Sequence, residues 1–251
     1  MQKPPIIVIV LLSLSMMFLW YMAKKKTNQT TNQNTIIVGT NAEYPPFTFI
    51  ENNRIVGLDI DIIGEISKRI GKKIEIKDMA FTALIPSLKF NKIQVIAAGM
   101  TPTAQRSKNI FFTDSYLEND PLLLITLKKN PISKIEELKN KKVVVNEGYI
   151  SDIYMSQING PILQKLATPS QGFDALKKGK SDAFIISKNS SKSYLKEGQQ
   201  EFSVTIIDET SNNYALGVSK QYPNLYRIIQ QTLQQLKKDG TLEKIKKKWG
   251  F

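Results

Sequence analysis

The chain has 251 residues, of which 41% are hydrophobic and 23% charged, and this is the composition of a globular protein long enough to form two lobes. It contains neither cysteine nor histidine, which excludes disulfides, thiolate or histidine metal sites, cysteine nucleophiles and histidine-dependent catalysis. The formal net charge is +13, but the lysines are spread through helical segments and loops, a pattern that argues against nucleic-acid binding.

The N-terminal residues 1–34 combine a targeting or membrane segment with a polar tether. An apolar run at 5–23 is followed by three lysines at 24–26, and it fits either a cleaved secretory signal or an uncleaved anchor. Tyr21 stands where signal cleavage needs a small residue, and lysines after the run conflict with simple export. We expect export, so that the folded part is periplasmic or extracytoplasmic, and both fates of the segment stay open: cleavage, or retention of 5–23 as a membrane anchor.

After the tether, strand and helix patterns alternate. We expect Asp59 to cap the first of the helices. The alternation predicts a parallel sheet with right-handed crossovers, in which ligands bind beyond the carboxyl ends of the strands. The expected strands are 36–40, 73–77 and 95–97, and the expected helices are 59–70 and 82–90. The loops that leave these strands, 41–47, 79–81 and 98–101, should therefore converge on one rim.

The third of these strands leads into the small residues Ala98 and Gly99 and the hydroxyl of Thr101. Small side chains let a ligand approach the backbone closely. Five residues beyond Thr101 comes Arg106, whose planar guanidinium suits a carboxylate held by two parallel hydrogen bonds. A carboxylate-binding arginine beside an amide-lined loop is the outline of an amino-acid site.

A second α/β unit follows, and the chain then returns to the first. A capping-box spacing at 133–136 predicts a helix start, and Ser151 or Asp152 is expected to cap another helix. The strands of this unit are expected at 122–127, 142–145, 182–186 and 204–207, with a helix at 170–178. The segment 214–218 is expected to rejoin the first unit and to be followed by helices at 223–238 and 242–249.

We therefore predict an α/β protein of two lobes with a hinged cleft between them. The first lobe comprises 35–121 and 214–251. The second comprises 122–213 and includes both crossings between the lobes.

In the order and spacing of its motifs, the chain resembles the polar amino-acid-binding proteins of bacterial ABC importers, solute-binding family 3. The matching stretches are V-G-T-N-A-E-Y-P-P-F at 38–47, V-G-L-D-I-D-I at 56–62, F-T-D-S-Y at 112–116 and D-G-T-L-E-K-I-K-K-K-W at 239–249. The run A-F-T-A-L-I-P-S-L-K-F at 80–90 and A-G-M at 98–100 look most like the arginine-binding members. The resemblance implies a type II periplasmic-binding-protein fold with two crossing strands.

The resemblance also implies a set of ligand-binding residues. Arg106 would pair with the ligand carboxylate, helped by a backbone N–H near Ile150, while Tyr44 and Phe81 would sandwich a guanidinium side chain. The full set that it implies is Asn41, Glu43, Tyr44, Phe81, Ala98, Gly99, Thr101, Arg106, Ile150 and Ser187.

Three positions depart from the family pattern by lacking an acid. Asn41 and Thr48 stand where members commonly have acidic residues, and Ser187 stands where an aspartate usually faces the α-ammonium. A buried ammonium without a partner is costly, so either water or another acid compensates, or the ligand is not a standard α-amino acid. Glu43 and Glu147 are the candidate acids.

The leading hypothesis is a monomeric binding protein, without catalysis or cofactor, that closes on a polar or cationic amino acid, with arginine favoured. It would then present the closed form to an ABC permease in the membrane. Two alternatives stay open. One is an enzyme on the same fold, similar to cyclohexadienyl dehydratases, with Glu43 or Glu147 as general acid. The other is a membrane-tethered sensor that has lost amino-acid binding.

Overall fold

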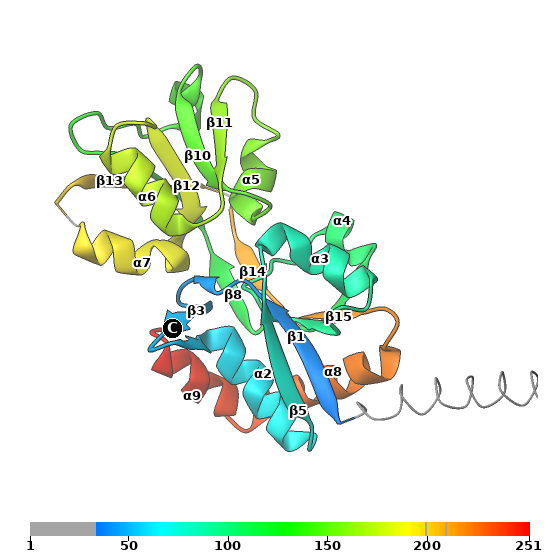
Figure 1. Ribbon diagram of the computed structural model, residues 1–251. Coiled ribbons are helices and arrows are strands. Elements are labelled where there is room, and N and C mark those ends of the chain that lie inside the picture. The colour runs from blue at the N-terminus through cyan, green and yellow to red at the C-terminus, as the bar shows by residue number, and fades with distance from the viewer. Residues whose placement is uncertain (1–33, 199, 209) are drawn as a thin grey trace, which may run out of the picture.

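The computed structural model describes residues 34–198, 200–208 and 210–251. Two α/β lobes lie one above the other, joined through the crossing strands β8 (Leu117–Asp120) and β14 (Asn212–Tyr214), which pair antiparallel (Figure 1). The apolar run at 5–23 lies outside the described residues. Within the described ranges, no helix has both the length and the apolar character needed to cross a membrane.

The first lobe is built on a five-stranded sheet in the order β5-β1-β6-β15-β7. Strand β1 pairs in parallel with both β5 and β6, so that Val38 lies between Ile76 and Val95. This confirms the predicted parallel unit, and β15 completes the sheet as an antiparallel strand. The strands are β1 (Thr35–Thr40), β5 (Lys73–Asp78), β6 (Val95–Ile96), β7 (Ile110–Phe112) and β15 (Gly217–Ser219).

Four longer helices and one short helix belong to this lobe: α2 (Leu58–Arg69), α3 (Phe81–Lys89), α8 (Pro223–Lys238), α9 (Thr241–Lys248) and α4 (Ala104–Ser107). The longer ones bury the apolar stripes that their sequences carry at helical spacing, for example Ile62, Ile63 and Ile66 on α2. A three-stranded sheet of β2 (Glu43–Tyr44), β3 (Thr48–Glu51) and β4 (Arg54–Val56) precedes α2. Its turn places both Asn52 and Asn53 at positive φ, as a tight hairpin requires.

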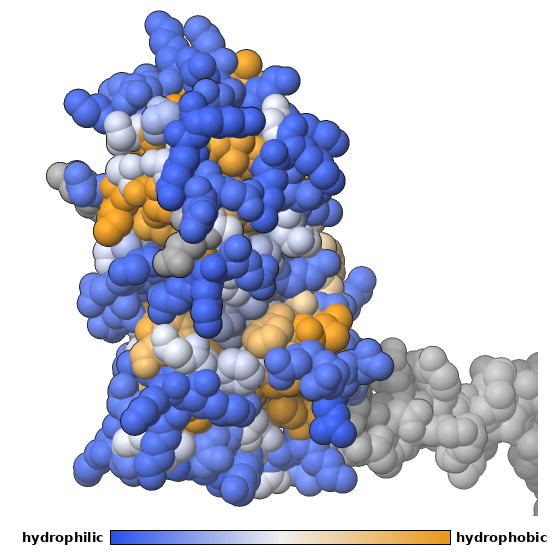
Figure 2. Space-filling model, turned by 90° about the vertical axis from the view of Figure 1, so that its left-hand side faces the viewer, coloured by the Kyte–Doolittle hydropathy of each residue, from blue (hydrophilic) through white to orange (hydrophobic). Residues whose placement is uncertain are grey.

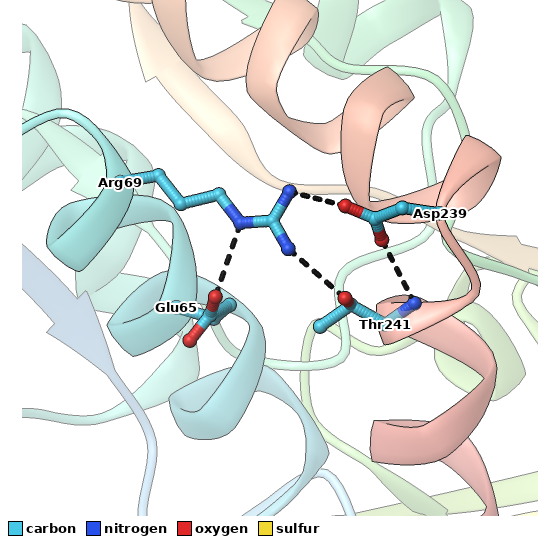
Figure 3. Close-up of polar contacts among 4 residues, drawn as sticks. All are labelled: Glu65, Arg69, Asp239 and Thr241. Atoms are coloured by element: carbon cyan, nitrogen blue, oxygen red, sulfur yellow. Dashed lines mark hydrogen bonds and ion pairs between the residues drawn. The ribbon is translucent and has the colours of Figure 1, made fainter.

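The C-terminal helices are fixed to α2 by polar contacts on the surface of the lobe. Arg69 reaches Glu65 at 3.0 Å, Asp239 at 2.6 Å and the Thr241 hydroxyl at 2.9 Å, and Asp239 accepts a further hydrogen bond from the Thr241 amide (Figure 3). Because ion pairs exposed to solvent stabilise little, this network orients α8 and α9 more than it strengthens the fold.

The second lobe has its own five-stranded sheet, in the order β11-β10-β12-β9-β13. Strand β10 runs parallel to β11 and β12, whereas β9 runs antiparallel to β12 and β13. The elements are β9 (Leu122–Leu127), η1 (Ile135–Leu138), β10 (Lys142–Asn146), α5 (Ile150–Met155), β11 (Ile162–Leu166), α6 (Pro169–Lys177), β12 (Ala183–Ser187), α7 (Lys188–Glu197) and β13 (Phe202–Ile206).

Both faces of this second sheet are covered. Alternate residues of β10 point to opposite sides, so Val143 and Val145 pack with Met155 of α5, while Val144 packs with Phe173 of α6. This explains why the central strands of the lobe read as continuous apolar runs. On the face shown in Figure 2, hydrophilic side chains cover most of both lobes and leave smaller hydrophobic patches.

Three predicted helix starts were wrong. Helix α2 begins one residue before Asp59, with Gly57 as N-cap, so the Asp59 carboxylate turns into the core instead of capping the helix. The segment after Ser133 forms only the single turn η1, without a side-chain cap. Tyr149 is the N-cap of α5, and Asp152 lies inside the first turn and accepts a hydrogen bond from the Gly148 amide at 2.9 Å.

Candidate functional site

Loops at the carboxyl ends of strands in both lobes meet at the junction between the lobes. From the first lobe come the residues after β1 and β6 and the start of α3, and from the second come Gly148 and Tyr149 after β10. A direct hydrogen bond joins the two sides, from the Tyr149 hydroxyl to Asn41 Oδ1 at 2.8 Å. The structure therefore brings the predicted rim together, and it adds a residue that the sequence analysis did not select.

Arg106 lies at this junction with only 7% of its surface exposed. Its Nη1 donates to the Thr101 carbonyl and its Nη2 to the Gly148 carbonyl, both at 2.6 Å, and its guanidinium lies 5.4 Å from the centre of the Phe81 ring. Burial lowers the pKa of Arg106 to about 10, which leaves it charged at neutral pH. In the described part of the chain it forms no ion pair with a carboxylate, so it is a buried cation whose partners are neutral carbonyls.

The buried carboxyl group of Asp59 holds the loop 98–101 in place. The Gly99 amide donates to Asp59 Oδ2 and the Tyr116 hydroxyl to Asp59 Oδ1, each at 2.7 Å. Burial raises the pKa of Asp59 to about 7. Gly99 has φ +56, and a Cβ at this position would come within 3.2 Å of Tyr44 and Phe47, so a side chain here would strain the backbone and push these rings aside. Because the Gly99 N–H is already used, the ligand contact expected from this residue stays a prediction.

The aromatic slot that Tyr44 and Phe81 were expected to form around a ligand side chain contains the ring of Tyr149. The ring centres lie 3.7 Å from Phe81 and 4.4 Å from Tyr44, with interplanar angles of 22° and 28°. Tyr149 is 3% exposed, and burial raises its pKa well above the usual value, so its hydroxyl keeps its proton. Its place directly after Gly148, at the end of a predicted strand, was the signal available in the sequence.

A polar cluster lies around Asp120, the last residue of the crossing strand β8. Asp120 is fully buried and accepts hydrogen bonds from the Tyr214 hydroxyl at 2.6 Å and the Asn189 amide at 3.0 Å, and burial raises its pKa. The hydroxyls of Ser187 and Ser190 lie beside the Tyr44 phenol: burial raises the pKa of Tyr44 to about 12, and the two hydroxyls partly oppose this increase. Both serine oxygens are buried, and no described group meets either of them with full hydrogen-bond geometry. Sequence reasoning missed Asp120, although it stands directly before Pro121 at the predicted boundary between the lobes.

The other predicted residues lie near these clusters with less definite contacts. Glu43 and Glu147 are both exposed, and Glu43 accepts only a 3.5 Å contact from Asn41. Ile150 is the first residue of α5, Ala98 is buried, and Thr101 uses its carbonyl for Arg106. Thr48 is buried and hydrogen-bonds Thr40. Among the residues that the structure describes, no three acidic side chains gather to hold a metal ion.

Two α/β lobes joined by two crossing strands, with a buried arginine and an aromatic slot at their junction, define a two-lobed solute-binding protein. Comparison with known proteins gives the family. Residues 36–251 match the bacterial extracellular solute-binding proteins, family 3, and the chain belongs to that family. The resemblance seen in the sequence is thereby confirmed.

Three proteins illustrate what this chain is similar to. The probable ABC transporter arginine-binding protein ArtJ of Chlamydia trachomatis is 28% identical over 90% of each chain. An ancestral arginine-binding protein bound to arginine is 34% identical, with a TM-score of 0.82 over 88% of this chain and 100% of that one. The ancestral amino acid-binding protein AncCDT-1, a precursor of cyclohexadienyl dehydratase, is 28% identical, with a TM-score of 0.79 over 88% of this chain and 98% of that one.

Proposed function

We propose that the protein captures a polar or cationic amino acid outside the cytoplasm, arginine being the favoured ligand, and presents it to an ABC permease. The observation that carries this proposal is Arg106, a buried guanidinium between the lobes whose hydrogen-bond partners, among the residues that the structure describes, are two carbonyl oxygens. A buried cation of this kind is stabilised by an anion, and the planar fork fits the carboxylate that every free amino acid has. The names of the three similar proteins support an amino-acid ligand, and two of the three name arginine.

The aromatic slot supports a flat cationic side chain. A guanidinium between the rings of Tyr44 and Phe81 would gain stacking and cation–π energy on both faces, roughly 0.5 to 2 kcal/mol for each ring. Asn41 Oδ1, which lies within 2.8 Å of the group now in the slot, offers a hydrogen-bond acceptor at the end of it. The slot therefore favours arginine over amino acids with small or acidic side chains.

The α-ammonium group of the ligand requires an acidic partner. We assign this role to Asp120 in place of the exposed Glu43 and Glu147. Asp120 is the buried carboxylate of the polar cluster that also contains the buried hydroxyls of Ser187 and Ser190. Two hydroxyl oxygens and one carboxylate match the three hydrogen-bond donors of an ammonium group. Asp120, at the end of the crossing strand β8, would thus take the role that an aspartate at position 187 has in the family pattern.

Changing Asp120 to asparagine should lower the affinity for arginine about tenfold, because the amide keeps the contacts of residue 120 but loses its charge. The effect should be specific to the amino group. Calorimetric titration should show that an arginine analogue without its α-amino group binds the variant and the unchanged protein equally well. Glu118→Gln, on the same strand but exposed, is the matched control. An equal loss for both ligands would contradict the assignment.

Thermal-shift measurements with single amino acids test the function itself. At a concentration about a hundred times Kd, a true ligand should raise the Tm by about 5 to 10 °C, because it binds only the folded state. Arginine should give the largest shift, with lysine and glutamine next. If none of the common amino acids raises the Tm, the proposal of amino-acid capture is wrong for this chain.

One observation favours a second candidate, a membrane-tethered sensor that has lost amino-acid binding. Tyr149 fills the slot in which the ligand side chain would lie. In this alternative the segment 5–23 remains as an anchor and the lobes stay closed permanently. The enzyme alternative has no such observation in its favour, because the carboxylates nominated for it, Glu43 and Glu147, are exposed.

A further inference from the structure

The segment Gly148–Tyr149 contacts the groups that the proposed function assigns to a ligand. The Tyr149 ring lies between Tyr44 and Phe81, at centre distances of 4.4 and 3.7 Å. Its hydroxyl donates to Asn41 Oδ1 at 2.8 Å. A flat cationic side chain entering the slot would use the same two ring faces and the same oxygen.

The backbone of the segment occupies the other end of the site. The Gly148 carbonyl accepts a 2.6 Å hydrogen bond from Arg106 Nη2, the guanidinium proposed to hold the carboxylate. Gly148 has φ +74, and a Cβ there would come within 2.9 Å of Thr82 on the first lobe, so glycine permits this close approach. The Gly148 amide is fixed within the second lobe by Asp152 Oδ2 at 2.9 Å.

We propose that Tyr149 is a built-in competitor for the ligand side chain, and that it determines the affinity and specificity of the site by holding the ligand-free lobes closed. The inference rests on the proposed function. A ligand must displace the ring from the slot, so its apparent affinity is the intrinsic affinity multiplied by the fraction of molecules in which the slot is empty. Only ligands that gain as much from the two rings and Asn41 as Tyr149 does can compete.

Removing the ring should therefore tighten binding. If about nine tenths of the ligand-free molecules are self-occupied, Tyr149→Ala should bind arginine about tenfold more tightly than the unchanged protein. Tyr149→Phe, which keeps the ring but loses the contact with Asn41, should lie between them. Isothermal titration with arginine measures the Kd of the unchanged protein, of Tyr149→Ala and of Tyr149→Phe. Tyr226→Ala is the matched control, because Tyr226 stacks on Phe111 away from the junction.

A distance measurement tests the inference even without ligand binding. The chain has no cysteine, so Lys89→Cys and Gln157→Cys, at exposed positions on the two lobes, allow spin labels to be attached without removing other thiols. Ligand-free protein should give a narrow distribution of label-to-label distances centred at a short distance. Adding Tyr149→Ala to the labelled protein should shift the distribution to longer distances and broaden it.

The outcomes separate the two proposals. Weaker arginine binding by Tyr149→Ala, or an unchanged distance distribution in that variant, would overturn the role of Tyr149. If no amino acid binds either the unchanged protein or Tyr149→Ala, the proposed function fails. The distances then decide alone whether the ring holds the lobes together.

Discussion

Arg106→Ala is expected to abolish the thermal shift produced by arginine, with a loss of affinity of at least about a hundredfold. The guanidinium is the buried cation at the junction, and removing it would leave the ligand carboxylate desolvated without a charged partner, a change that costs about 2 to 5 kcal/mol. Isothermal titration with arginine measures the loss.

The same substitution should leave the ligand-free fold intact. It removes two hydrogen bonds to carbonyls but also a desolvated charge, so the free energy of unfolding should change by about 1 kcal/mol or less. Arg106→Lys keeps the charge without the planar fork and should bind only weakly. Arg69→Ala, in the exposed network of Figure 3, is the control and should bind normally. Normal arginine binding by Arg106→Ala would refute the carboxylate role.

Much of the fold could be predicted because the pattern of apolar residues determines which segments are buried. The helix 223–238 was predicted with the bounds that the structure has, and most strands of the two sheets were placed within one or two residues. Among the elements that sequence reasoning missed are the crossing strand β8, the strands β7 and β11 and the helix α7. β11 lies at the edge of its sheet, where all of its side chains are exposed or half-buried, and α7 carries a largely polar sequence, so neither has a strong apolar signal.

Only those parts of the candidate site that local strand and turn patterns indicate could be predicted from the sequence. Arg106, Tyr44 and Phe81 follow strand or turn patterns that place them at the rim, and the structure brings them to the junction of the lobes. The occupation of the slot by Tyr149 depends on the second lobe closing on the first, which no local pattern encodes. The buried positions of Asp59 and Asp120 were also missed, because each aspartate accepts hydrogen bonds from a segment distant in the sequence, Asp59 from Gly99 and Asp120 from Tyr214.

Asp59 should make the stability of the ligand-free protein depend on pH. Burial raises its pKa from the ordinary 3.8 to about 7, so between these values the folded state binds more protons than the unfolded chain. The contribution to stability is therefore fully present below about pH 4, declines as the pH rises toward 7 and is lost above it. A difference of about three pKa units corresponds to a free energy of unfolding on the order of 4 kcal/mol.

The variant Asp59→Asn isolates this effect. The amide resembles the protonated carboxyl, since its oxygen can accept from the Gly99 N–H while its NH₂ donates to the Tyr116 oxygen. Urea unfolding between pH 4 and 8 should show a flatter pH dependence than the unchanged protein and greater stability at pH 8. Asp174→Asn, at an exposed position on α6, is the control and should keep the original slope. If Asp59→Asn and the unchanged protein lose stability in parallel as the pH rises, Asp59 is charged in the fold throughout, and the loop 98–101 is held by a carboxylate rather than a neutral acid.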